Sequence, residues 1–178
     1  MTSERISVLV LGLGNILCGD DGAGVVAVHQ LSRRWRVPEG VRIVDGGTLG
    51  LDLLALVAAS DRVILVDAVR ADASAGTLVR LTGDEVAPAV YERLSPHQIG
   101  VADLIAGAAL CERYPSEVVI IGVVPAMTDL QLGCTPAVEA SVPGLVGNVL
   151  AELRRLGHQP EPRETICEPH EGARALGL

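Results

Sequence analysis

Short apolar runs alternate with helix-like segments along this chain, and this alternation constrains the fold more than any other feature. Four runs rich in valine, leucine and isoleucine are expected to be strands: Ile6–Leu13, Val41–Asp45, Arg62–Asp67 and Glu117–Val124. Apolar runs without a polar face are typical of parallel strands that are buried on both sides. Repeated strand–helix units predict an α/β three-layer sandwich, in which a twisted, mostly parallel sheet of about five strands has helices on both faces.

The helices and the remaining strand are predicted from periodicity and from helix start signals. Helices are expected over Gly22–Trp35, Thr48 to about Ala59, Ile99–Glu112 and Thr135 to about Leu156. The Ser95-Pro96-His97-Gln98 run has the residues of a helix start, with serine as N-cap and proline at the first helical position. Gly76–Leu81 alternates in polarity, which favours an edge strand paired antiparallel.

Length and composition indicate one domain with an aliphatic core. Of the 178 residues 49% are apolar, but only 2% are aromatic. We expect a single α/β domain over residues 1–157 and a flexible tail over residues 158–178, where the periodicity is lost. The formal charge of −8 and the lack of a basic cluster argue against nucleic acid or an anionic membrane as partner.

The cysteines and the first residues bear on the compartment. No apolar signal core follows the N-terminus, and no stretch approaches the ~20 apolar residues that span a bilayer. Four widely spaced cysteines form no CxxC pair and are formally compatible with two disulfides: Cys18, Cys111, Cys134 and Cys167. Without a secretion signal we expect reduced thiols and a cytoplasmic protein.

Aspartates gather at the ends of three predicted strands. Asp21 follows the glycine-rich turn after the first strand, Asp45 ends the second, and Asp67 ends the third. The carboxyl ends of parallel strands meet at one edge of the sheet, where ligands bind in open α/β folds. With His97 at a helix start, Asp21 and Asp67 offer a donor set that suits zinc, nickel or manganese. The positive end of the helix dipole favours a neutral His97 that can bind metal.

These residues also have structural interpretations. Asp21 could cap the first helix, Asp67 could bond to neighbouring backbone amides, and His97 taken alone is more often structural. Asp20 is expected to be solvated or to act as a cap. The glycine turn is a poor nucleotide site, because Leu17 stands where a third glycine is needed and no Gly-Lys-Ser/Thr follows. Pyrophosphate would also meet the like charge of two aspartates.

Five ordered motifs resemble those of the hydrogenase maturation proteases, the endopeptidases that trim the large subunit of nickel–iron hydrogenases. They are Gly12-Leu13-Gly14-Asn15-Ile16-Leu17 with Asp20-Asp21-Gly22-Ala23-Gly24, Asp45-Gly46-Gly47-Thr48, Leu65-Val66-Asp67-Ala68, Ser95-Pro96-His97-Gln98 with Gly100, and Ile121-Gly122-Val123-Val124-Pro125. The motifs keep the family's order and approximate spacing from residue 6 to about residue 156. The resemblance implies an α/β fold with a twisted sheet between helices.

The resemblance also implies the reaction. The substrate would be the precursor of a nickel–iron hydrogenase large subunit, whose C-terminal extension is removed after nickel insertion. The inserted nickel, supplied by the substrate, would be gripped by Asp21, Asp67 and His97; many members have Glu where Asp21 stands, and others have Asp. The Asp45-Gly46-Gly47-Thr48 segment is implied as a substrate-binding element.

The way in which the peptide bond is attacked stays open. A metal-bound water could be the nucleophile, or Asp21 or Asp67 could act as the general base. The alternative function is a non-catalytic nickel-binding or chaperone module that checks the precursor without cutting it. A nucleotide-binding enzyme is a third reading of the glycine turn. We expect no nucleotide cofactor and a monomeric protein.

Overall fold

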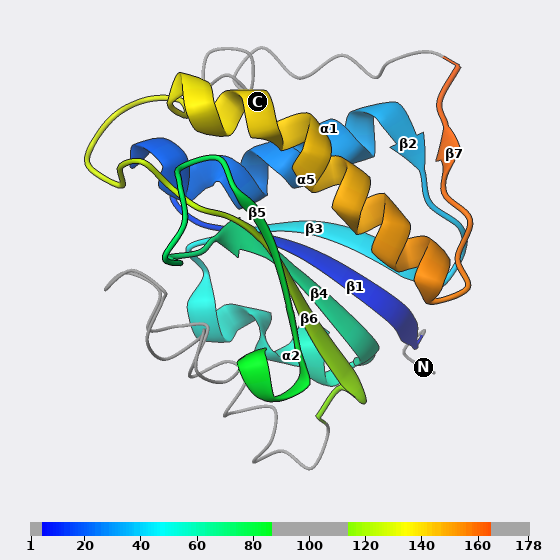
Figure 1. Ribbon diagram of the computed structural model, residues 1–178. Helices are drawn as coiled ribbons and strands as arrows, with labels where there is room; N and C mark the ends of the chain where they lie inside the picture. The colour runs from blue at the N-terminus through cyan, green and yellow to red at the C-terminus, as the bar shows by residue number, and fades with distance from the viewer. Residues whose placement is uncertain (1–4, 87–113, 165–178) are drawn as a thin grey trace.

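The computed structural model describes residues 5–86 and 114–164 of the chain. A five-stranded sheet runs through it in the order β3-β1-β4-β6-β5 (Figure 1). The strands are β1 (Ile6–Leu13), β3 (Val41–Gly47), β4 (Ser60–Ala68), β5 (Leu78–Thr82) and β6 (Glu117–Val123). The first four in spatial order are parallel, whereas β5 pairs antiparallel with β6 at the edge. The predicted mostly parallel sheet and its antiparallel edge strand are both confirmed.

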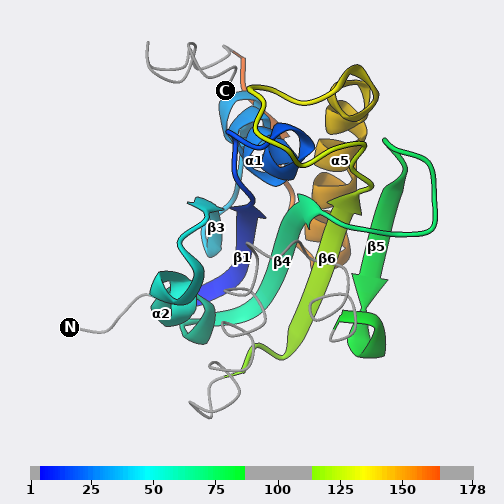
Figure 2. The same cartoon turned by 90° about the vertical axis from the view of Figure 1, so that its left-hand side faces the viewer.

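Helices cover both faces of the sheet, which confirms the three-layer arrangement (Figure 2). α1 (Ala23–Arg34) and α5 (Pro136–Arg155) lie on one face, and the short α2 (Leu54–Ala58) lies on the other. The helix predicted from Thr48 is instead a 3-10 turn, η2 (Gly50–Leu53), that continues into α2. A further 3-10 turn, η3 (Gly83–Glu85), follows β5. The predicted helix start at residues 95–98 and the helix over 99–112 lie outside the described residues.

Two apolar cores lie on the two faces of the sheet, and β1 contributes to both. Leu9 and Leu11 pack in the core that also contains Val57 of α2, whereas Val8 and Val10 pack in the core formed with α1 and α5. All four of these β1 side chains are fully buried. Burial of each side chain contributes about 1.5–3 kcal/mol to the free energy of folding. Because both faces of the strand are buried, apolar residues are needed at every position. No helix in residues 5–86 and 114–164 is long and apolar enough to cross a membrane.

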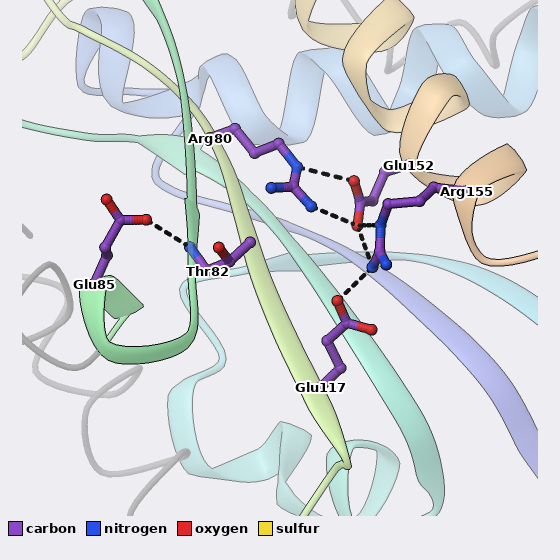
Figure 3. Close-up of polar contacts among 6 residues, drawn as sticks. All are labelled: Arg80, Thr82, Glu85, Glu117, Glu152 and Arg155. Carbon is purple, nitrogen blue, oxygen red and sulfur yellow. Dashed lines mark hydrogen bonds and ion pairs between the residues drawn. The ribbon is translucent and has the colours of Figure 1, made fainter.

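A charged network joins α5 to β5 and β6 (Figure 3). Glu152 of α5 is 3% exposed and accepts hydrogen bonds from Arg80 of β5 at 2.9 and 3.1 Å. Arg155 bonds to Glu152 at 2.8 Å and also pairs with Glu117 at the start of β6. Burial alone would raise the pKa of Glu152, but the bonds and charges of the two arginines outweigh it and leave the pKa below its ordinary value.

Regular structure continues past Gly157. The two-residue strand β7 (Glu161–Pro162) pairs antiparallel with β2 (Trp35–Arg36), which directly follows α1. The Arg163 side chain donates to the carbonyl oxygens of Ser32 and Trp35, both at 3.1 Å. The first part of the range for which a flexible tail is predicted is therefore bonded to the end of α1. Residues 165–178 lie outside the described residues.

Candidate functional site at the carboxyl edge of the sheet

The glycine-rich segment between β1 and α1 turns the chain at the carboxyl edge of the sheet and contains the 3-10 turn η1 (Gly19–Gly22). Gly14 has φ +112°, a region that residues with side chains rarely adopt, and an added Cβ would lie 1.8 Å from the carbonyl oxygen of Asp21. A Cβ on Gly24 would lie 2.0 Å from the carbonyl oxygen of Val66 on β4. Gly14 therefore lets the chain leaving β1 pass close to η1, and Gly24 lets the start of α1 pack directly on the end of β4.

Asp21 and Asp67 are buried at the ends of neighbouring parallel strands. Gly12 of β1 pairs with Val66 of β4, and Asp67 follows Val66. Asp21 is 3% exposed and Asp67 is 1% exposed. Asp21 Oδ2 accepts a hydrogen bond from the N–H of Asn15, and Asp67 Oδ1 accepts one from the N–H of Ala68, both at 2.7 Å. Each of these hydrogen bonds orients its carboxylate at the carboxyl edge of the sheet.

The structural interpretations of these aspartates are met in part. Asp67 does bond to a neighbouring backbone amide. Asp21 bonds to Asn15, which precedes it, and the N-cap position of α1 is occupied by Gly22. His97 lies outside the described residues, so the set of two carboxylates and an imidazole stays a prediction. Within the described ranges, no group of three His, Cys, Asp or Glu side chains gathers at one point.

Asp20 has a role that the sequence did not indicate. The expectation of a solvated side chain is wrong, because Asp20 is fully buried. Its oxygens accept hydrogen bonds from the N–H groups of Ala126, Met127 and Thr135 at 2.8, 3.3 and 2.6 Å, and from the Thr135 hydroxyl at 3.0 Å. Asp20 therefore fastens the glycine loop to the loop that joins β6 to α5. These partners are more than a hundred residues away, so no local pattern could have revealed them.

The Asp45-Gly46-Gly47-Thr48 segment lies at the same edge, because Asp45 pairs with Gly12 at the end of β1. Asp45 Oδ2 lies 2.8 Å from Nε2 of His29 on α1, and its side chain is 43% exposed. Gly46 is explained by packing, since a Cβ there would lie 2.8 Å from the side chain of Leu11. Asp45 and Thr48 are thus the accessible side chains of this segment.

Two cysteines lie near the candidate site, and one of them, Cys134, is a poor nucleophile. Cys18 and Cys134 are free cysteines in the described residues, whereas Cys111 and Cys167 lie outside them, so the reduced state of all four stays a prediction. Burial, together with the negative charges of Asp20 and Glu139, raises the pKa of Cys134 to about 11. A thiol with that pKa is protonated at neutral pH and is a poor nucleophile.

Known proteins with similar sequences show the family to which this chain is related. The sequence model of a family described as hydrogenase maturation protease matches residues 25–152. The chain is 38% identical over 160 residues to the hydrogenase 2 maturation protease of Escherichia coli K12, covering 89% of this chain and 98% of that protein. It is 39% identical over 170 residues to the hydrogenase expression/formation protein HupM of Azotobacter chroococcum, covering 94% of this chain and 81% of that protein.

Solved structures give the same result. The hydrogenase maturating endopeptidase HybD from E. coli superposes with a TM-score of 0.83 at 38% identity, covering 88% of this chain and 98% of that one. A hydrogenase 2 maturation peptidase from a Thaumarchaeota archaeon gives a TM-score of 0.65 at 29% identity, covering 83% of this chain and 98% of that one. By sequence and by fold, the chain belongs to the hydrogenase maturation protease family.

Proposed function

We propose that this protein is an endopeptidase that removes the C-terminal extension of a nickel–iron hydrogenase large-subunit precursor after nickel insertion. Membership of the family supports the peptidase activity, and the relatives are named as hydrogenase maturation proteases. One structural observation carries the assignment of the site. Asp21 and Asp67 are buried and oriented by backbone hydrogen bonds at the ends of neighbouring parallel strands, where α/β folds bind their ligands.

The nickel is part of the substrate in this proposal. Asp21 and Asp67, with His97, would grip the ion that the precursor carries, since carboxylate oxygens and imidazole nitrogen are ligands that a borderline divalent cation accepts. A precursor without nickel would lose this grip and escape cleavage. We propose no role for a nucleotide, since pyrophosphate at the glycine turn would meet the like charge of Asp20 and Asp21.

Gripping the ion would also position the bond to be cut. A precursor anchored through its nickel presents its C-terminal segment at a fixed place, which turns the attack of water into a reaction between prealigned groups. Asp21 or Asp67 would accept the proton of that water as general base. Asp45 and Thr48, exposed at the same edge of the sheet, would contact the polypeptide beside the site.

The test is to mix purified precursor with purified protein and to measure the masses of the products by mass spectrometry. Nickel-loaded precursor should lose its C-terminal extension, and nickel-free precursor should stay intact. The combined variant His97→Ala with Asp67→Asn should abolish cleavage. Cleavage that ignores nickel, or that survives this double substitution, would contradict the assigned recognition. A non-catalytic checking module predicts instead that a complex forms while the mass of the precursor stays the same.

The remaining expectations concern assembly and compartment. We propose a monomer that acts in the cytoplasm, where the free thiols of Cys18 and Cys134 would stay reduced. Size-exclusion chromatography with light scattering should give the mass of one chain, about 18.5 kDa.

A further inference from the structure

Exposed leucines gather at the edge of the sheet that carries the candidate site. Six large apolar side chains are exposed in the described part of the chain: Leu17, Leu49, Leu51, Leu130, Leu132 and Tyr114. The five leucines lie on the segments that follow the carboxyl ends of β1, β3 and β6, with Leu51 in η2, whereas Tyr114 precedes β6 at its opposite end. Single exposed apolar residues are ordinary, but a group of them on one edge indicates a surface that contacts a partner.

Three of these leucines belong to two segments that are bonded together. The N–H of Gln131 donates to the carbonyl oxygen of Leu17 at 2.9 Å, and the N–H of Gly19 donates to the carbonyl oxygen of Gln131 at 2.8 Å. Leu130 and Leu132 flank Gln131 and are 85% and 66% exposed, and Leu17 is 45% exposed. We call Leu17, Leu130 and Leu132 the leucine platform. Leu130 and Leu132 lie on the longer of its two loops, which joins β6 to α5 and passes beside the start of α1 (Figure 2).

Asp20 anchors the longer loop, which carries Leu130 and Leu132, at both of its ends. Its bonds to Ala126 and Met127 hold one end of the longer loop, and its bonds to Thr135 hold the other end. Leu130 and Leu132 lie between these two anchored ends. A loop that is fixed before binding loses little conformational entropy when a partner docks, so its apolar surface is used efficiently.

We propose that the leucine platform binds an apolar segment of the precursor polypeptide next to the bond that is cut. The proposal rests on the peptidase function given above. Asn15 links the platform to the candidate site, because its N–H donates to Asp21 Oδ2 at 2.7 Å and its Oδ1 accepts a hydrogen bond from the N–H of Leu17 at 3.0 Å. A peptidase has to hold the polypeptide beside the reacting bond, and burial of exposed leucine against apolar side chains supplies that affinity without any demand on direction. The net charge of −8 disfavours nucleic acid as the occupant.

The test is the double variant Leu130→Ser with Leu132→Ser, measured with nickel-loaded precursor. Both side chains are exposed, so the variant should fold, and its thermal unfolding should match that of the wild type. KM should rise about tenfold or more while kcat stays within about twofold, because binding is lost and the reacting groups are untouched. Tyr114→Ser, which removes the exposed apolar side chain at the other end of β6, serves as the control and should leave both constants unchanged.

Direct binding separates this proposal from the proposed function. Surface plasmon resonance with the nickel-loaded precursor should show that the double variant binds about tenfold more weakly than the wild type. If the wild type cleaves but the double variant has the same KM and Kd as the wild type, the proposed binding at the platform is wrong and the proposed peptidase function is supported. If the wild type binds without cleaving, the peptidase fails and a weaker Kd of the double variant still supports the platform. A wild type that neither binds nor cleaves overturns both.

Discussion

Buried carboxylates occur in two regions of this protein, and the two regions stabilise them in different ways. Glu152 of α5 lies between Arg80 and Arg155 (Figure 3), so its charge is met by two positive charges. At the carboxyl edge, Asp20 receives all four of its hydrogen bonds in the described residues from backbone N–H groups and a hydroxyl. Burying a carboxylate is costly unless it is hydrogen-bonded or paired, and each region meets this requirement with its own type of donor.

The type of donor that stabilises a buried carboxylate indicates the role of its region. A glutamate paired with two arginines is neutralised within the protein, which fits a purely structural link between α5 and the sheet. The N–H groups of Asn15 and Ala68 orient Asp21 and Asp67 and do not themselves bring a full positive charge, which suits carboxylates that are directed at a cation. We therefore expect substitutions at the two regions to separate activity from stability.

The largest effect is expected at Asp67. Asp67→Asn keeps the shape of the side chain but removes its charge, and should lower the rate of precursor cleavage by about a thousandfold, as loss of a group that touches the reacting centre does. The rate of product formation and the thermal unfolding midpoint should be measured together. Asp61→Asn is the matched control, because Asp61 lies near the opposite end of the same strand and its carboxylate pairs with Arg5 at the surface. Equal losses in the two variants would show that the loss of cleavage is not specific to the carboxylate at the carboxyl edge.

Burial is the main cause of the raised pKa of the Cys134 thiol, and the negative charges of Asp20 and Glu139 raise it further. With its pKa raised to about 11, Cys134 should react with iodoacetamide at pH 8 about a hundredfold more slowly than a cysteine in an unfolded peptide, because only the thiolate attacks. Mass spectrometry of the labelled residue gives the rate. Asp20→Asn removes one of the negative charges that raise the pKa and should speed the reaction. A rate in the native protein equal to that in urea would contradict this account.

At the other region the expected loss is of stability. Glu152→Gln removes the negative charge between two arginines and replaces one of the two acceptor oxygens by an NH2 donor, and should lower the free energy of unfolding by about 1–3 kcal/mol, measured by urea denaturation. Cleavage by the folded variant should be unchanged. Glu117→Gln tests the outer member of the network, and the exposure of its side chain limits the loss to less than about 1 kcal/mol. A Glu152→Gln variant with full stability would show that the network contributes nothing net.

The smallest effect is the dependence of that stability on pH. Because the arginines hold the pKa of Glu152 below its ordinary value, the stabilisation is complete above the ordinary pKa of a glutamate, about 4.3. It is lost as the pH falls through the lowered pKa of the folded state. The difference in unfolding free energy between wild type and Glu152→Gln should therefore be constant from about pH 6 to 8 and shrink once the pH falls below the ordinary pKa of a glutamate. A difference that grows on acidification would have the wrong sign.

Much of the fold could be predicted because its signals are local. The run Ile6–Leu13 is apolar at every position, as a strand between two cores must be, and it forms β1 with the predicted bounds. Thr135-Pro136 begins α5 as its start signal predicts. The region after Thr48 was harder, because the 3-10 turn η2 and the five-residue α2 are too short to show a helical period.

The candidate site was predictable only where a strand end fixes the position of a residue. Asp67 follows a run of apolar residues, and the parallel pairing of β4 with β1 brings it to the edge that Asp21 shares. Asp20 and Asp21 are adjacent and chemically identical, so the sequence could not tell which one is directed at the longer loop and which one bonds to Asn15. The part played by His97 stays a prediction.

The sequence by itself determined the layer order, the parallel sheet and the edge at which the aspartates gather, because these follow from apolar periodicity and from chain reversal at glycine. Only the tertiary structure decided that Asp20 is a fully buried anchor for a loop more than a hundred residues away, that this loop exposes Leu130 and Leu132, and that Glu152 is buried between arginines. The physical reason is that burial and hydrogen-bond partners depend on which distant segments meet. A side chain's chemistry permits several such meetings, and the packed fold selects one of them.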